Sequence, residues 1–79
     1  MITVLLFGPV ADRAGIRQVE FDFAPGLRLQ ELHDTLQARY PEAFALVSMT
    51  AVNGAQVRDM SNELPDHSEV VFMSKFSGG

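Results

Sequence analysis

The 79-residue sequence has room for one domain and not for a deep catalytic cavity, because a chain of this size buries only about 60 to 65% of its unfolded surface. It contains no cysteine, which excludes disulfides, a thiol nucleophile and a cysteine-based zinc site. Ten acidic and six basic residues give a net charge of -4, so nucleic acid is not an expected partner, whereas a basic protein surface would suit the chain.

The N-terminal run "MITVLLFG" is expected to be a strand and not a targeting segment. It lacks the basic start and the small-residue cleavage site of a signal peptide, and no run in the sequence reaches the ~18 apolar residues of a membrane span. These features predict a cytoplasmic protein with no membrane partner.

Two strands are predicted in the first third of the chain. Residues 2–7, "ITVLLF", are mostly apolar, which favours a central strand buried on both faces. Residues 18–23, "QVEFDF", alternate between apolar and polar and predict a strand with one solvated face. Residues 8–17 are short enough to join them as an antiparallel pair through an irregular connection.

A helix is predicted after the "PG" pair at 25–26. Its apolar residues recur at helical spacing and share one face: Leu29, Leu32, Leu36 and Tyr40. Arg28 stands where a capping Ser or Thr is typical, so the start of the helix is weakly specified. Pro41 ends the helix or begins a following turn.

The pair Asn53-Gly54 predicts a hairpin that joins strands at 49–52 and 55–58. A polar connection with a helical turn near Leu64 is expected next, and then a last strand at 69–74. The order strand, strand, helix and three strands is typical of an α+β sheet with its helix on one face.

If the first and last strands lie parallel in the centre, their connection is right-handed and both apolar runs are buried. We therefore predict a ubiquitin-like β-grasp, a mixed sheet with one main helix packed on one face. Residues 1–74 form this domain, and residues 75–79 form a flexible tail.

The tail, "KFSGG", reaches ~17 Å when extended at ~3.3 to 3.6 Å per residue. Gly78 and Gly79 let the backbone pass through a narrow slot, so the tail can present the carboxylate of Gly79 to another protein. A carboxylate is a poor acyl donor until ATP converts it to an adenylate. The segment "GPVADRAG" lacks the Lys and Ser/Thr of a phosphate-binding loop, so we expect that a partner uses the ATP and that this chain binds no cofactor and no metal.

Three segments, "VLLFGPVADRAG", "AVNG" and "SEVVFMSKFSGG", with their spacing, resemble the MoaD/ThiS sulfur-carrier family over essentially the whole chain. The resemblance to its molybdopterin synthase small subunits implies that a MoeB-like enzyme adenylates Gly79, which then becomes a thiocarboxylate. It further implies that the tail enters a MoaE-like large subunit in a heterotetramer. There it donates sulfur to cyclic pyranopterin monophosphate, and the isolated chain has no activity of its own.

Two departures from the family pattern are visible. "DHSE" replaces the common Asp-Gly-Asp turn, where Asp66 and Ser68 are still expected to form local side-chain to backbone bonds. Ser74-Lys75 replaces a Pro-Pro pair, which is expected to loosen the base of the tail and to add a cation.

Several side chains are candidates for partner contact. Phe76 is expected to dock on a partner, and Lys75 either guides the tail or keeps the last strand soluble. Phe7 and Phe72 are either core residues or parts of a contact patch. His33 and His67 are predicted to be surface residues without a metal.

Other functions remain open on the sequence. The chain is alternatively a ThiS-like carrier for thiazole or another pathway, a ubiquitin-like protein modifier, or a plain binding module. The fold alone does not distinguish them.

Overall fold

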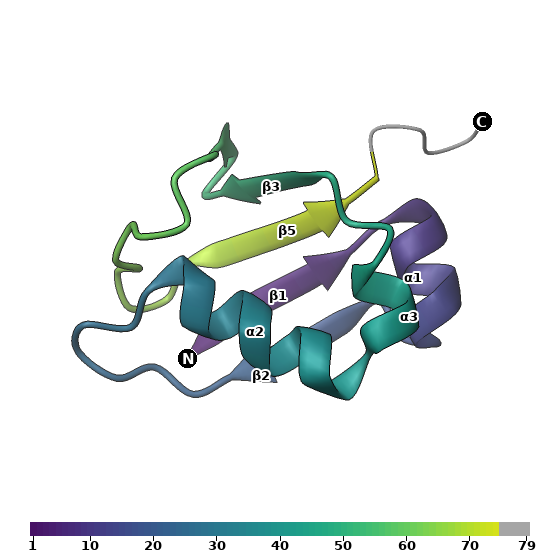
Figure 1. The fold of residues 1–79 in the computed structure, drawn as a ribbon. Coiled ribbons are helices and arrows are strands. Elements are labelled where there is room, and N and C mark those ends of the chain that lie inside the picture. Colours follow the sequence, from purple (N-terminus) through teal and green to yellow (C-terminus); the bar gives the residue numbers. More distant parts are fainter. Residues whose placement is uncertain (75–79) are drawn as a thin grey trace.

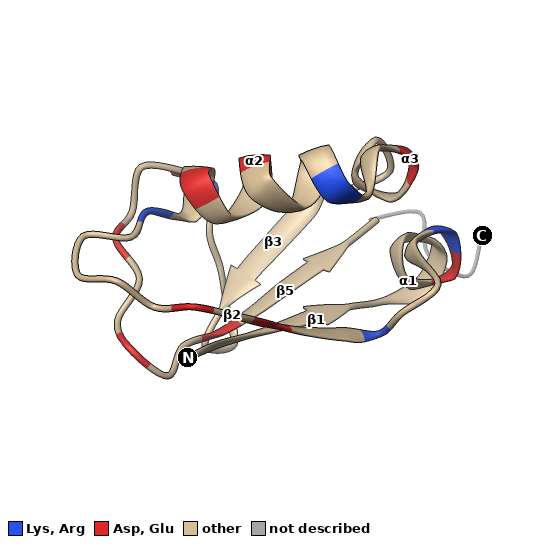
Figure 2. Ribbon diagram, turned by 90° about the horizontal axis from the view of Figure 1, so that it is seen from below, with Lys and Arg blue, Asp and Glu red and all other residues tan. Residues whose placement is uncertain are grey.

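The computed structural model describes residues 1–74 as a sheet with helices over one face (Figures 1 and 2). The elements in chain order are β1 (Ile2–Leu6), α1 (Gly8–Ala14), β2 (Gln18–Phe21), α2 (Leu29–Arg39), α3 (Pro41–Phe44), β3 (Met49–Val52), β4 (Ala55–Gln56) and β5 (Glu69–Met73). Within this part of the chain, no helix is both long and apolar enough to cross a membrane. Acidic residues are spread over the helices, β2 and the loops, and the basic ones are dispersed among them (Figure 2).

The sheet has the order β2-β1-β5-β3-β4. The two central strands run parallel, with Val4 of β1 opposite Val70 of β5, and the outer neighbours β2 and β3 run antiparallel to them. This arrangement confirms the predicted mixed sheet with parallel first and last strands. The predicted ubiquitin-like β-grasp is the fold of the described residues.

The prediction that β1 is buried on both faces is wrong. Its side chains alternate, with Ile2, Val4 and Leu6 buried and Thr3 and Leu5 half-buried. The helices α2 and α3 cover one face of the sheet (Figure 2), and the residues of β1 that alternate to the other face, Thr3 and Leu5, keep part of their contact with water.

Helix α1 replaces the irregular connection that the sequence predicted for residues 8–17. Pro9 stands in its first turn, where the missing N–H costs nothing, and Gly15 closes it with a φ of 76°. The Gly15 N–H donates to the Ala11 carbonyl over 2.9 Å, and Val10 and Ala11 are buried. A proline near the start and a glycine just after the end are helix signals that this seven-residue segment carried in its sequence.

Helix α2 follows the predicted apolar face. Leu29, Leu32 and Leu36 are fully buried. Arg28 is its N-cap residue and makes no capping side-chain bond, as expected. Pro41 begins the short helix α3 directly after it.

The hairpin turn forms where Asn53-Gly54 predicts it, with φ of 50° and 86° at the two residues. Strand β4 is shorter than predicted and ends at Gln56. No helical turn forms at Leu64: this residue is buried, its N–H donates to the Leu27 carbonyl over 2.8 Å, and the preceding Glu63 forms a β-bridge with Arg28.

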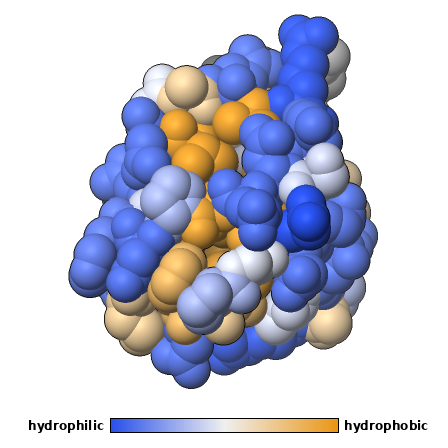
Figure 3. Space-filling model, turned by 90° about the vertical axis from the view of Figure 1, so that its left-hand side faces the viewer, coloured by the Kyte–Doolittle hydropathy of each residue, from blue (hydrophilic) through white to orange (hydrophobic). Residues whose placement is uncertain are grey.

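The side of the molecule that carries these long connections is shown in Figure 3. Its hydrophobic surface is gathered in one band between hydrophilic residues. The half-buried Val57 and Met60 belong to the connections and pack against the core. The connections are therefore part of the packed domain and not loose loops.

Candidate functional site

The candidate site lies at the end of the sheet where the two central strands stop. Because β1 and β5 are parallel, Phe7 after β1 and Ser74 after β5 lie at the same end (Figure 1). The Phe7 N–H donates to the Phe72 carbonyl over 3.2 Å and ties the two strand ends together. Ser74, which was predicted to loosen the base of the tail, is buried.

The residues that carry the predicted chemistry follow directly after this point. Lys75, Phe76, Gly78 and Gly79 lie outside the described residues, as does the predicted tail at 75–79 as a whole. Their roles therefore stay predictions. The described domain supplies the strand from which they continue.

The sequence left open whether Phe7 and Phe72 are core residues or parts of a contact patch, and the structure gives a different answer for each. Phe7 is 47% exposed, which suits contact with a partner. Phe72 is fully buried, so it is a core residue, and its assignment to a contact surface is corrected. The reason is register: Phe72 pairs with Leu6 and Thr50 and points under the helices, whereas Phe7 lies beyond the last paired residue of β1.

A hollow of about 320 Å³ lies beside Phe7. Its walls come from the end of β1, from α1 and from the start of β2, and they include Leu5, Asp12 and Arg17. An exposed aromatic ring beside a hollow with charges of both signs is a surface on which another protein can dock.

His33 was predicted to be a surface residue, and this is wrong. Its ring packs edge-on against Phe44 at 5.4 Å and against Phe72 at 5.8 Å between ring centroids. Its side chain is only 20% exposed, and its buried Nδ1 has no hydrogen-bond partner. Positions 29, 32, 33 and 36 lie on one face of the helix. The spacing of His33 from the leucines could therefore have predicted that it packs on the same face.

The turn before β5, where "DHSE" replaces the common Asp-Gly-Asp, forms the local side-chain to backbone bonds that were predicted. The His67 N–H donates to Asp66 Oδ1 over 2.8 Å, and the Ser68 hydroxyl donates to the Pro65 carbonyl over 2.6 Å. The bond from the Met1 ammonium, at 3.0 Å, is the first cause that holds the pKa of Asp66 below its ordinary value. His67 is exposed, as expected.

Asp59 is the other described carboxylate with a shifted pKa. Its pKa lies below the ordinary value because the Ser61 hydroxyl and the Ser61 N–H both donate to it, over 2.6 and 2.9 Å. Asp59 and Asp66 both lie on connections outside the hollow beside Phe7. Among residues 1–74, no three His, Asp or Glu side chains gather where they could share a metal ion.

Sequence comparison decides the family. A model of the ThiS family matches residues 4–79. The chain belongs to the ThiS family. Members of this family are small ubiquitin-like sulfur carriers that work with partner enzymes. No curated protein sequence gives a significant match to this member.

Solved structures share the fold of this ThiS-family chain. One is a Pyrococcus furiosus protein provisionally named molybdopterin converting factor subunit 1, with 23% identity, a TM-score of 0.80, and coverage of 92% of this chain and 94% of that one. Another is SAMP1 of Haloferax volcanii, with 20% identity, a TM-score of 0.81, and coverage of 99% and 98%. A third is the Haloferax volcanii protein HVO 2177, with 16% identity, a TM-score of 0.78, and coverage of 99% and 85%. At these identities the likeness establishes the β-grasp fold.

Proposed function

We propose that this ThiS-family chain is the sulfur-carrying small subunit of a molybdopterin synthase, and that Gly79 is its reacting residue. The observation that supports this most is the position of β5. It is a central strand, hydrogen-bonded to β1 on one side and to β3 on the other, and the sequence continues from it for six more residues. A strand held on both sides is a rigid base from which a tail can be offered to another protein.

The chemistry needs a partner at each step. A MoeB-like enzyme uses ATP to convert the Gly79 carboxylate to an acyl adenylate and releases pyrophosphate. A sulfur donor then replaces AMP, which leaves a thiocarboxylate. The chain has no cysteine to supply this sulfur itself, so the sulfur comes from outside.

The thiocarboxylate then delivers sulfur to cyclic pyranopterin monophosphate inside a MoaE-like large subunit, in a heterotetramer in the cytoplasm. Gly78 threads the tail into that subunit, and Phe76 and Lys75 contact it. Phe7 and the hollow beside it form the docking surface of the domain. The isolated chain binds no cofactor in this scheme.

Intact mass spectrometry tests the first step. The protein is incubated with ATP, a sulfur source and a MoeB-like enzyme, and is then alkylated. Exchange of oxygen for sulfur adds about 16 Da, nearly the same as oxidation of a methionine, and the sequence has four methionines. Alkylation separates the two, because a cysteine-free chain has no competing thiol. We expect one alkylated group, and peptide mapping should place it at Gly79.

An unmodified Gly79 in the presence of an enzyme that is active on a known carrier would contradict the proposal. A ladder of protein conjugates in cells would identify a modifier instead. Transfer of the sulfur to a thiazole precursor and not to cyclic pyranopterin monophosphate would identify a ThiS-like carrier. These outcomes separate the carrier chemistry from the choice of acceptor.

A further inference from the structure

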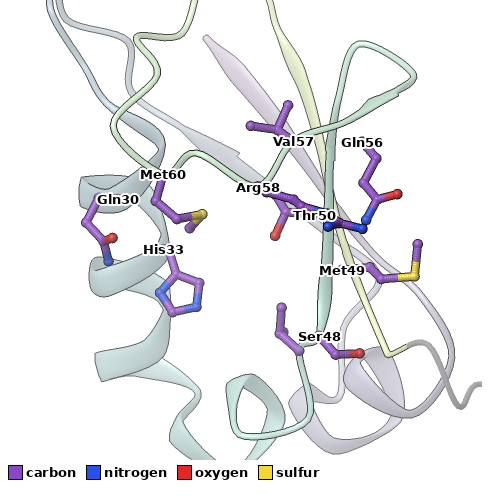
Figure 4. A pocket seen from close by; sticks show the side chains of 10 residues that line it. Gln30, His33, Ser48, Met49, Thr50, Gln56, Val57, Arg58 and Met60 are labelled. Carbon is purple, nitrogen blue, oxygen red and sulfur yellow. The ribbon is translucent and has the colours of Figure 1, made fainter.

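A second and larger cavity shares no lining residue with the hollow beside Phe7, and its edge at residues 48–50 lies along the end of β5, with Met49 opposite Met73. It has a volume of about 830 Å³ and is open to solvent. One wall comes from α2, with Gln30 and His33, and the other from the start of β3 and from the segment after β4 (Figure 4). The proposed sulfur transfer does not use this cavity.

The lining is divided between apolar and polar groups. Val47, Met49, Val57 and Met60 supply apolar surface, and the two thioethers adapt easily to the shape of an occupant. His33 extends from α2 toward the space between the walls (Figure 4). Small-molecule sites combine apolar walls with a few polar groups in this way, and their volumes are typically about 300 to 1,000 Å³.

The charge of the cavity is opposite to that of the whole chain. Arg58 lines it and has no hydrogen bond or ion pair with any other described residue, and none of the lining residues is acidic. Two carboxylates are close in sequence but do not line the cavity, although Asp34 Oδ1 lies 3.6 Å from Nδ1 of the lining residue His33. Asp34 accepts a hydrogen bond from Gln30 over 2.8 Å, and Asp59 accepts from Ser61.

We propose that this cavity binds a small amphipathic anion, a carboxylate carried on a short apolar body. Arg58 attracts the carboxylate, and the valine and methionine side chains hold the apolar part. A concave site with facing walls suits a small molecule better than a protein surface, which is typically broad. The inference does not depend on the proposed sulfur transfer.

NMR titration of the full chain tests the site, with octanoate as the probe. Isotope-labelled protein should show saturable shifts at the methyl groups of Val57 and Met60 and at the ring of His33. Acetate, which has the charge without the apolar body, and octanol, which has the body without the charge, should both bind more weakly. The Arg58→Ala variant should bind octanoate about 1.5- to fivefold more weakly, the range expected for an exposed ion pair.

Arg39→Ala is the matched control, because Arg39 lies at the other end of α2 and its guanidinium packs over the Tyr40 ring. It should leave octanoate binding unchanged. Three results would overturn the proposal: no saturable shift at millimolar octanoate, shifts only around Phe7, or equal weakening by both arginine variants. Tighter binding of the peptide acetyl-Leu-Glu-Leu-amide than of octanoate would overturn it in favour of a docked protein segment. Thiocarboxylate formation at Gly79 is measured separately, so the two proposals fail independently.

Discussion

Phe7 and Phe72 show how one position in the pleat of a strand decides the role of a side chain. Phe72 lies within β5 and packs edge-on against Phe44, with 5.0 Å between ring centroids. Phe7 follows the last residue of β1, where no strand or helix of residues 1–74 covers it, and keeps nearly half of its surface exposed. Of the two rings, only that of Phe7 is available to another protein.

We expect Phe72→Ala to lower the free energy of unfolding by about 3 to 5 kcal/mol, because it removes a fully buried ring from the core. Phe7→Ala should lower it by less than about 1 kcal/mol. Urea unfolding followed by circular dichroism measures both. Equal losses would mean that Phe7 is packed in solution, and its assignment as a docking residue would be wrong.

The two bonds that Ser61 donates to Asp59 give a second prediction at this scale. Ser61→Ala removes the hydroxyl bond, which is the largest cause of the lowered pKa, and leaves the N–H bond. The pKa of Asp59 should therefore rise toward its ordinary value. A carboxyl NMR titration measures it, and the pKa of Asp66, whose partners are elsewhere, should not move.

The direction of the linked stability change follows from the lowered pKa of folded Asp59. The stabilising contribution of this carboxylate is fully present above its ordinary pKa, near pH 4, and is lost as the pH falls through the lower folded value. Ser61→Ala should therefore lower stability at neutral pH and reduce the loss between pH 4 and lower values. An unchanged pH profile would show that the Ser61 hydroxyl does not bond to Asp59 in solution.

At the scale of elements, the start of α2 is completed by a distant part of the chain. The Leu29 N–H donates to the Asn62 carbonyl over 2.9 Å, and the Gln30 N–H donates to the Met60 carbonyl over 2.8 Å. Arg28 reinforces the contact, since its Nη1 donates to the Ser61 carbonyl over 2.6 Å. Backbone carbonyls of the connection after β4 thus accept the N–H groups that a capping side chain would otherwise accept.

We expect the amides of Leu29 and Gln30 to be protected from hydrogen exchange, although first-turn amides of a helix are usually open to water. Exchange followed by NMR measures this. The amide of Glu42, in the first turn of α3, is the comparison, because that helix has no capping side-chain bond. Exchange at Gln30 as fast as at Glu42 would show that the connection does not hold the helix in solution.

At the scale of the whole molecule, the proposed reacting residue, Gly79, lies outside the described part of the chain. The core residues that the structure describes lie between Ile2 and Phe72. Deletion of Gly79 should therefore change the free energy of unfolding by less than about 0.5 kcal/mol and abolish sulfur delivery. Unfolding and the alkylation assay are measured on the same sample. Sulfur delivery by the shortened chain would rule out both carrier functions.

The sequence alone indicated the parallel pairing of the first and last strands, the buried face of α2 and the hairpin at Asn53-Gly54, because these depend on apolar patterns and on turn residues with few alternatives. The segments that carry the family resemblance likewise led to the ThiS family, which the comparison confirmed. Pro9 and Gly15 could have predicted helix α1, and the spacing of His33 from the leucines could have predicted its place on the inner side of α2.

Other features depended on contacts between segments far apart in the chain, which no local pattern contains. The hydrogen bond from Leu64 to Leu27 and the cap of α2 exist because the connection after β4 lies against the start of that helix. The burial of Phe72 and the exposure of Phe7 depend on which face the helices cover and where strand pairing stops. The cavity beside Arg58 exists only where α2, β3 and this connection meet, so the tertiary structure alone revealed it.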